Sequence, residues 1–135
     1  MSAPKMDIDQ HYPLLIGGKF VEGVAGKTFT SICPATGEIL CTLAEAGKED
    51  VDLAVKAAQE AFKTWREVPA PARAKLLNKI ADLYDERLGK IAQVEAMDCG
   101  KPIRDVYINN PVDGGSTAAF WRYFAGAIQT EEGSA

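Results

Sequence analysis

The first hydrophobic runs along the chain are short and predict strands rather than helices. One run covers residues 14–16 and a second covers residues 20–21, with the pair Gly17-Gly18 between them. Two adjacent glycines inside a strand pattern are typical of a kink or bulge, so we expect one interrupted strand. The polar residues before it, 1–13, are expected to form a flexible leader.

Two further strands are predicted by β-branched, alternating residues at 28–32 and 39–43. Between them stands the sequence Cys33-Pro34-Ala35-Thr36-Gly37-Glu38, in which proline sets one φ angle and glycine permits a positive one. These residues therefore predict a turn between the two strands. The first third of the chain is therefore expected to form a small antiparallel ribbon, which is marginally stable unless its apolar face is covered.

From Lys48 the hydrophobic period changes from two to about 3.6 residues, which predicts a first amphipathic helix. The face that we expect to be buried carries Val51, Ala54, Val55, Ala58, Ala61, Phe62 and Trp65. Acidic residues at its start are expected to stabilise it, because the amino-terminal end of a helix dipole is positive. Val68-Pro69-Ala70 is expected to end it.

A second helix is predicted to begin at Pro71, because proline is well suited to the first helical turn. Its expected buried stripe is Leu76, Leu77, Ile80, Leu83, Tyr84 and Leu88. Gly89 predicts a break, followed by a short third helix that ends at Gly100, where Pro102 should prevent the helix from resuming. A last helix should open at Asn110-Pro111 and run to Ile128.

Composition places this pattern in an ordinary globular class. The 135 residues suffice for one domain, and 47% are hydrophobic while 25% are charged. A formal net charge of -4 argues against nucleic acid or an anionic membrane as partners. No apolar run reaches the length of a transmembrane helix or a secretory signal, and three unpaired cysteines fit a reducing cytoplasm.

Motifs for self-contained catalysis are missing from the sequence. The single histidine, His11, lies in the expected leader, where a precisely held catalytic imidazole is not expected. Cys33, Cys41 and Cys99 form no C-x-x-C pair, and no phosphate loop or metal-ligand spacing occurs. The residues alone therefore assign no catalytic, cofactor-binding or structural metal site.

The order of the motifs is more informative than any one of them. In register over residues 14–129, the chain carries these segments: Leu15-Ile16-Gly17-Gly18-Lys19-Phe20, Cys33-Pro34-Ala35-Thr36-Gly37-Glu38-Ile39, Glu49 to Ala58, Trp65-Arg66, Arg73 to Asp82, Asp98-Cys99-Gly100-Lys101-Pro102 and Phe120 to Gly126. Together they resemble the amino-terminal part of the aldehyde dehydrogenase superfamily. Cys33 and Cys99 depart from that resemblance, because asparagines are common at both places in the family.

The resemblance implies an α+β chain, a short antiparallel β ribbon followed by about four helices, that forms the amino-terminal part of a Rossmann-like α/β cofactor domain. Residues 14–135 would be that partial domain. The complete enzyme would oxidise an aldehyde to a carboxylic acid with NAD or NADP, as a cytoplasmic homo-oligomer. The cofactor turn, glutamate base and nucleophilic cysteine of the family do not occur here, so we expect the chain alone to bind no cofactor and to be inactive.

Two sets of site residues follow from the resemblance alone. A monovalent cation would be held by the backbone carbonyl of Ile32 and the carboxylate of Asp98, oxygen ligands that a hard cation prefers. Alternatively, Asp98 is a capping or surface acid. The last helix would line the aldehyde entrance tunnel with Val112, Ser116 and Phe120, beside two glycines that would leave space for a bulky or polar aldehyde.

Two other interpretations stay open. The chain could be a truncated, non-catalytic paralogue that serves as an interaction module, for instance with a full-length relative. It could also be an unrelated α+β domain. The fragment and module hypotheses both predict exposed hydrophobic surface, and they are separated by whether the reading frame continues past Ala135 into cofactor and nucleophile motifs.

Overall fold

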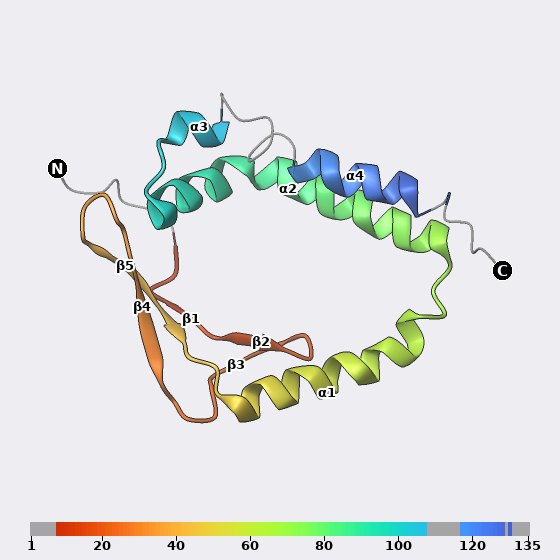
Figure 1. Ribbon diagram of the computed structural model, residues 1–135, viewed down its shortest axis with the longest axis horizontal. Helices are drawn as coiled ribbons and strands as arrows, with labels where there is room; N and C mark the ends of the chain where they lie inside the picture. Colours follow the sequence, from red (N-terminus) through yellow and green to blue (C-terminus); the bar gives the residue numbers. More distant parts are fainter. Residues whose placement is uncertain (1–7, 108–116, 129, 131–135) are drawn as a thin grey trace. The chain divides into compact units, whose positions relative to one another are not determined.

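A computed structural model describes residues 8–107, 117–128 and 130 of the chain. The elements follow the predicted order of strands and then helices, so the α+β class is confirmed (Figure 1). The chain divides into two compact units, Met1–Glu67 and Val68–Ala135. The first holds five strands and one helix among the described residues, and the second holds three helices.

In the first unit, β2 (Leu14–Ile16) and β3 (Lys19–Val21) form an antiparallel hairpin. The predicted kink within one strand is therefore wrong. Gly17 and Gly18 have φ angles of 59° and 77°, and a two-residue hairpin turn of the favoured kind needs positive φ at both central positions. The glycine pair reverses the chain instead of bending it.

A second sheet has the strand order β1-β5-β4. β4 (Thr28–Ile32) and β5 (Ile39–Ala44) are antiparallel, as predicted, with an irregular register at Ser31/Ile32. β1 (His11–Tyr12) pairs in parallel with β5 and lies inside the expected leader. The predicted single antiparallel ribbon is thus two small sheets, because β2 and β3 pair only with each other, and the second sheet contains a strand that the pattern does not reveal.

The helix of this unit, α1 (Lys48–Trp65), has the predicted start and ends three residues before Val68, where the sequence predicts its stop. Its expected buried face is exposed in the described structure: Val51, Val55 and Phe62 are 53%, 50% and 58% exposed. The small buried core of the unit lies elsewhere, at Cys33, Cys41 and Ala44 of the β4–β5 hairpin.

In the second unit, α2 (Ala70–Cys99) continues through Gly89, so the predicted break and separate third helix are wrong. One glycine costs only about 1 kcal/mol relative to alanine inside a helix, which a long helix tolerates. Gly100 ends α2 in the left-handed conformation, with φ of 72°, as predicted. The expected buried stripe of α2 is half-buried at Leu77 and exposed at Leu76.

A short helix, α3 (Ile103–Tyr107), begins directly after Pro102, where the sequence predicts no resumption. Proline lacks only a backbone donor that the first turn of a helix does not use, and its carbonyl accepts the N–H of Asp105 at 2.9 Å. The proline therefore ends one helix and starts the next.

The last helix, α4 (Thr117–Ala127), packs along α2 (Figure 1). Its predicted start at residues 110–111 lies outside the described residues. Among the described residues of this unit, six are almost completely buried, and five of these are alanines: Ala74, Ala81, Ala92, Val106, Ala118 and Ala125. Small side chains allow the helix backbones to approach closely.

Arg122 of α4 adds ion pairs with α2 to this packing. Its Nη2 lies 2.8 Å from both Asp82 Oδ1 and Asp85 Oδ2 of α2, and these carboxylates raise the pKa of Arg122. Within the described residues, we find no helix that combines the length and the hydropathy needed to cross a membrane.

Candidate functional site

Ile32, whose carbonyl is the predicted cation ligand, is the last residue of β4 and directly precedes the β4–β5 turn. The turn is closed by its own backbone: Cys33 N–H donates to Glu38 O at 2.9 Å, and Gly37 N–H donates to Cys33 O at 2.8 Å. Gly37 has φ of 74°, the conformation that the sequence predicts for it. Ile32 therefore stands at an irregular point of the strand register and leads directly into a hydrogen-bonded turn.

Cys33 is buried in this turn, with 3% of the residue exposed. A hydrogen bond from the Thr36 hydroxyl is the main cause that lowers the pKa of the Cys33 thiol, while burial acts in the opposite direction. The thiol thus accepts hydrogen bonds within the turn. We assign it a structural role, because a buried thiol offers no access to a substrate.

Asp98, the other predicted cation ligand, lies in the last turn of α2 and is exposed. Directly after the helix, Lys101 Nζ lies 2.6 Å from Glu95 Oε1, and both side chains are about 70% shielded from solvent. This ion pair holds the chain back against α2 once Gly100 has ended it. Ile32 belongs to the first unit and Asp98 to the second, and each is described within its own unit.

The predicted tunnel face is described only at Phe120, which lies on α4 and is 53% exposed. Val112 and Ser116 lie outside the described residues. Three neighbours of Phe120 on the same helix are also exposed: Trp121, Tyr123 and Phe124. The last two stack edge to face, with ring centroids 5.3 Å apart. α4 therefore presents an aromatic surface.

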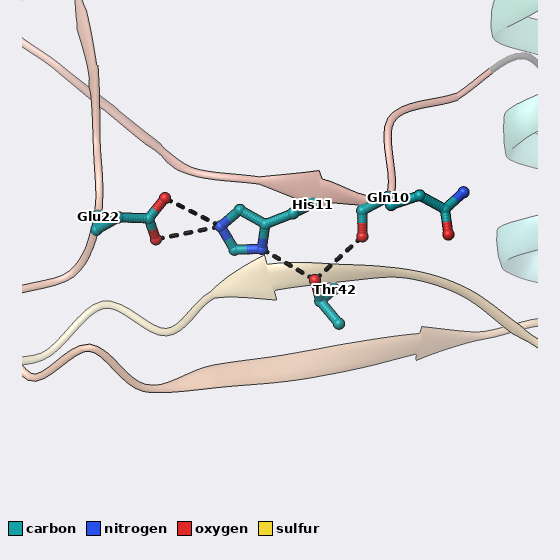
Figure 2. A network of polar contacts seen from close by, with 4 residues as sticks. All are labelled: Gln10, His11, Glu22 and Thr42. Carbon is teal, nitrogen blue, oxygen red and sulfur yellow. Dashed lines mark hydrogen bonds and ion pairs between the residues drawn. The ribbon is translucent and has the colours of Figure 1, made fainter.

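A cluster that the sequence does not reveal surrounds His11 in the first unit. Figure 2 shows the ring of His11 between the carboxylate of Glu22 and the hydroxyl of Thr42, which also contacts the carbonyl of Gln10. His11 therefore has defined side-chain partners, although the sequence places it in the expected leader. The pairing of β1 with β5 places Thr42, which is 31 residues away, beside the ring, and Glu22, which is 11 residues away, reaches it from the segment after β3.

The second missed residue is Asp50, which is 2% exposed at the start of α1. Its Oδ2 accepts the N–H of Gly47 at 2.8 Å, and its Oδ1 accepts the N–H of Val24 at 2.9 Å. These two hydrogen bonds lower the pKa of Asp50. Gly47 directly precedes the helix, and an acid three residues after such a position is a recognised capping signal. The bond to Val24, in contrast, is visible only in the fold.

None of these groups forms a catalytic constellation. Thr42, His11 and Glu22 align a hydroxyl, an imidazole and a carboxylate, yet the hydroxyl belongs to a strand residue that pairs with Thr30 in the sheet. In the part of the chain that the structure describes, no three His, Cys, Asp or Glu side chains are placed to hold a metal ion.

Comparison with known proteins relates this chain to one family. The family model described as "Aldehyde dehydrogenase family" matches residues 20–135. Aldehyde dehydrogenase 1 of Tanacetum cinerariifolium is 46% identical over 123 residues, and Aldehyde dehydrogenase family 2 member C4 of Arabidopsis thaliana is 43% identical over 122 residues. These matches cover 90% and 89% of this chain, and 24% of each relative.

Solved structures give the same result. The NAD+ complex of an aldehyde dehydrogenase from Bacillus cereus is 40% identical, with a TM-score of 0.84. That match covers 92% of this chain and 25% of the Bacillus cereus chain. The chain therefore spans about a quarter of the length of the relatives that it matches.

Proposed function

Since the chain belongs to the aldehyde dehydrogenase family and matches the amino-terminal quarter of its members, we propose that it is one part of an enzyme that oxidises an aldehyde to a carboxylic acid. The observation that carries this proposal is the match of 92% of the chain to a single quarter of an NAD-bound relative. A nicotinamide cofactor would accept hydride from the substrate in the complete enzyme.

In this proposal the chain contributes support rather than reactive groups. The described hydroxyl beside an imidazole, that of Thr42, belongs to a sheet strand, and no described residue is assigned to the cofactor. We therefore assign the nucleophile, the base and the cofactor contacts to the remaining three quarters of a family-length chain. Residues 14–135 would be a partial cofactor-binding domain. NAD or NADP as cofactor, a cytoplasmic location and a homo-oligomer are further parts of the proposal.

A monovalent cation is proposed to bind the carbonyl of Ile32 and the carboxylate of Asp98 in the complete enzyme. The donor set supports the proposal, because both atoms are oxygens, and Ile32 directly precedes a hydrogen-bonded turn. Asp98→Asn in the complete enzyme should reduce the dependence of activity on potassium, while Asp105→Asn on α3 should leave it unchanged.

The proposed substrate tunnel would use Phe120 from the aromatic surface of α4, together with Val112 and Ser116. Exposure of Phe120 supports this assignment, since a residue that lines a tunnel must not be covered by its own unit. In a complete enzyme, Ser116→Trp should lower kcat/KM for bulky aldehydes more than for small ones. Equal loss for both classes would contradict the tunnel.

The main test replaces the matching segment of the Bacillus cereus enzyme with this chain. We expect the chimera to reduce NAD in the presence of an aldehyde, and the same enzyme with the segment deleted to be inactive. The isolated chain should neither bind NAD nor oxidise aldehydes. A soluble, correctly assembled chimera without activity, or a saturable NAD titration of the isolated chain, would overturn the proposal.

The messenger RNA offers a second, independent test. If the reading frame continues past residue 135 into a cofactor turn and a cysteine nucleophile, the enzyme hypothesis is supported. A stop codon at that point, together with stable binding of the chain to a full-length relative, would support the interaction module instead.

A further inference from the structure

His11 is hydrogen-bonded through both ring nitrogens, although 34% of its side chain is exposed. Nε2 lies 3.1 Å from each carboxylate oxygen of Glu22, and Nδ1 lies 2.9 Å from Thr42 Oγ1 (Figure 2). Thr42 Oγ1 is also 3.1 Å from the carbonyl oxygen of Gln10. The ring therefore links the segment after β3 to β1 and β5.

The protons in this network follow from what each group can donate. The Glu22 carboxylate only accepts, so Nε2 must carry a hydrogen. The Thr42 hydroxyl has a single hydrogen and two possible acceptors, Nδ1 of His11 and the carbonyl of Gln10. That carbonyl already accepts the backbone N–H of Thr42 at 3.0 Å, so it does not require the hydroxyl. The protonation of Nδ1 therefore decides where the hydroxyl points.

We propose that His11, Glu22 and Thr42 form a proton-sensitive clasp that fixes β1 onto β5. When the ring is neutral, the Thr42 hydroxyl donates to Nδ1. When the ring is protonated, Nδ1–H donates to Thr42 Oγ1, and the hydroxyl turns to the Gln10 carbonyl. The protonated state gains one hydrogen bond between β5 and the residue before β1, and it gains an ion pair with Glu22.

In this fold the side-chain bonds of the clasp help to hold β1 on β5. β1 is only two residues long and pairs with β5 at His11↔Thr42 and Tyr12↔Leu43, so its backbone ladder is short. Side-chain bonds at His11 therefore form a large share of what holds it. Protonation of the clasp should tighten the β1–β5 pairing, and loss of the proton should loosen it.

The groups around the ring are consistent with a response to pH. In the described structure, Glu22 is the one charged side chain paired with the ring, and β5 contributes a neutral hydroxyl. On β1 itself, the Tyr12 hydroxyl accepts the backbone N–H of Asp9 at 3.0 Å and stays out of the network. Glu22 is 62% exposed, so protons exchange freely with solvent and added salt should weaken the ion pair.

Because His11 is the only histidine of the chain, its ring can be observed without ambiguity. Labelling with ¹⁵N-histidine and recording long-range ¹H–¹⁵N spectra from about pH 5 to 8, where imidazoles change charge, reports both nitrogens. We expect a doubly protonated ring at low pH and the Nε2–H tautomer at high pH. A neutral ring in the Nδ1–H tautomer, or ring shifts equal to those of an unfolded histidine, would overturn the clasp.

Amide exchange provides the structural readout. The protection factor of Thr42 N–H should fall by about two- to tenfold between about pH 5 and 8, the range expected for one net hydrogen bond. Glu45 N–H, which donates to Lys27 O in the same unit, is the internal reference and should not change. A pH-independent ratio of the two protection factors would overturn the proposal.

Three variants separate the clasp from general stability. Thr42→Val removes the hydroxyl at constant shape, and Glu22→Gln keeps an acceptor but removes the charge. Each should flatten the pH dependence of Thr42 exchange. Glu86→Gln, the same charge change on α2 of the second unit, should retain it. Full pH dependence in Glu22→Gln and Thr42→Val would show that another group titrates, and the proposal would fail.

Discussion

Asp50 shows how one side chain can join two segments of the chain. It accepts backbone N–H groups from Gly47, directly before α1, and from Val24, in the loop after β3. Next to this loop, a Cβ atom on Gly23 would lie 2.7 Å from the carbonyl oxygen of Glu45. The close approach that excludes a side chain at Gly23 is thus the same one that brings Val24 to the carboxylate.

Asp50→Asn should destabilise the first unit in a pH-dependent manner. The folded pKa lies below the ordinary value of 3.8, so the contribution of the carboxylate is fully present above that value. It is lost as pH falls through the lower folded pKa. Thermal unfolding followed by circular dichroism should therefore show a difference between wild type and variant that is constant near neutral pH and shrinks below about pH 4.

Asp52→Asn is the matched control for this experiment. Asp52 lies two residues further along α1, is 65% exposed and pairs with Lys48 on the surface. Exposed pairs of this kind contribute little to stability. A pH-dependent loss as large in Asp52→Asn as in Asp50→Asn would show that helix charge, rather than the two backbone bonds, explains the effect.

At the scale of elements, the contact between α2 and α4 depends on small residues. Ala81 is completely buried on α2, and Ala118 and Ala125 are each 1% exposed on α4. The hydrophobic pattern of α2 emphasises its leucines instead, and Leu83, for example, is 38% exposed. Leucine periodicity predicts that a helix has an apolar face, but it does not identify the line along which a second helix packs.

Ala118→Leu and Ala119→Leu test this packing at adjacent positions of α4. Ala118 is buried, so a larger side chain must force the helices apart, and we expect a loss of about 1–3 kcal/mol in the free energy of unfolding. Ala119 is exposed and should tolerate leucine within about 0.5 kcal/mol. Urea unfolding measures both. Equal effects at the two positions would contradict the described contact.

At the scale of the whole molecule, the main property is uncovered apolar surface in both units. In the first unit, Phe20, Ile39 and Phe62 are 75%, 65% and 58% exposed, and in the second, Tyr123 and Phe124 are 68% and 57% exposed. The prediction of exposed hydrophobic surface is confirmed. A chain that spans a quarter of its relatives is expected to leave such surface, because its counterparts have three further quarters with which to pack.

This surface should make the isolated chain bind apolar dyes and self-associate. We expect dye fluorescence well above that of a well-packed protein, and sedimentation above the mass of a single chain that increases with concentration. Phe62→Glu should reduce both at unchanged helix content, whereas Lys56→Glu, also on α1, should not. A monomeric chain without dye binding would contradict the prediction.

The sequence by itself determined the elements whose signals are local. Helical periodicity predicted α1 and its start at Lys48, Gly100 predicted the end of α2, and Gly37 predicted the β4–β5 turn. Motifs in a fixed order also predicted the family, because a register shared over more than a hundred residues is more specific than any single motif. These inferences need only neighbours in the chain or their order.

The tertiary structure decided what depends on partners far apart in sequence. The strand β1 is only two residues long, so no periodicity can reveal it, and it forms because β5 offers a parallel edge. Pairing across 31 residues then places Thr42 beside His11, and it turns an expected leader residue into the centre of a hydrogen-bonded network. Hydrogen bonds are short-ranged and directional, so their partners are fixed by the fold and not by spacing along the chain.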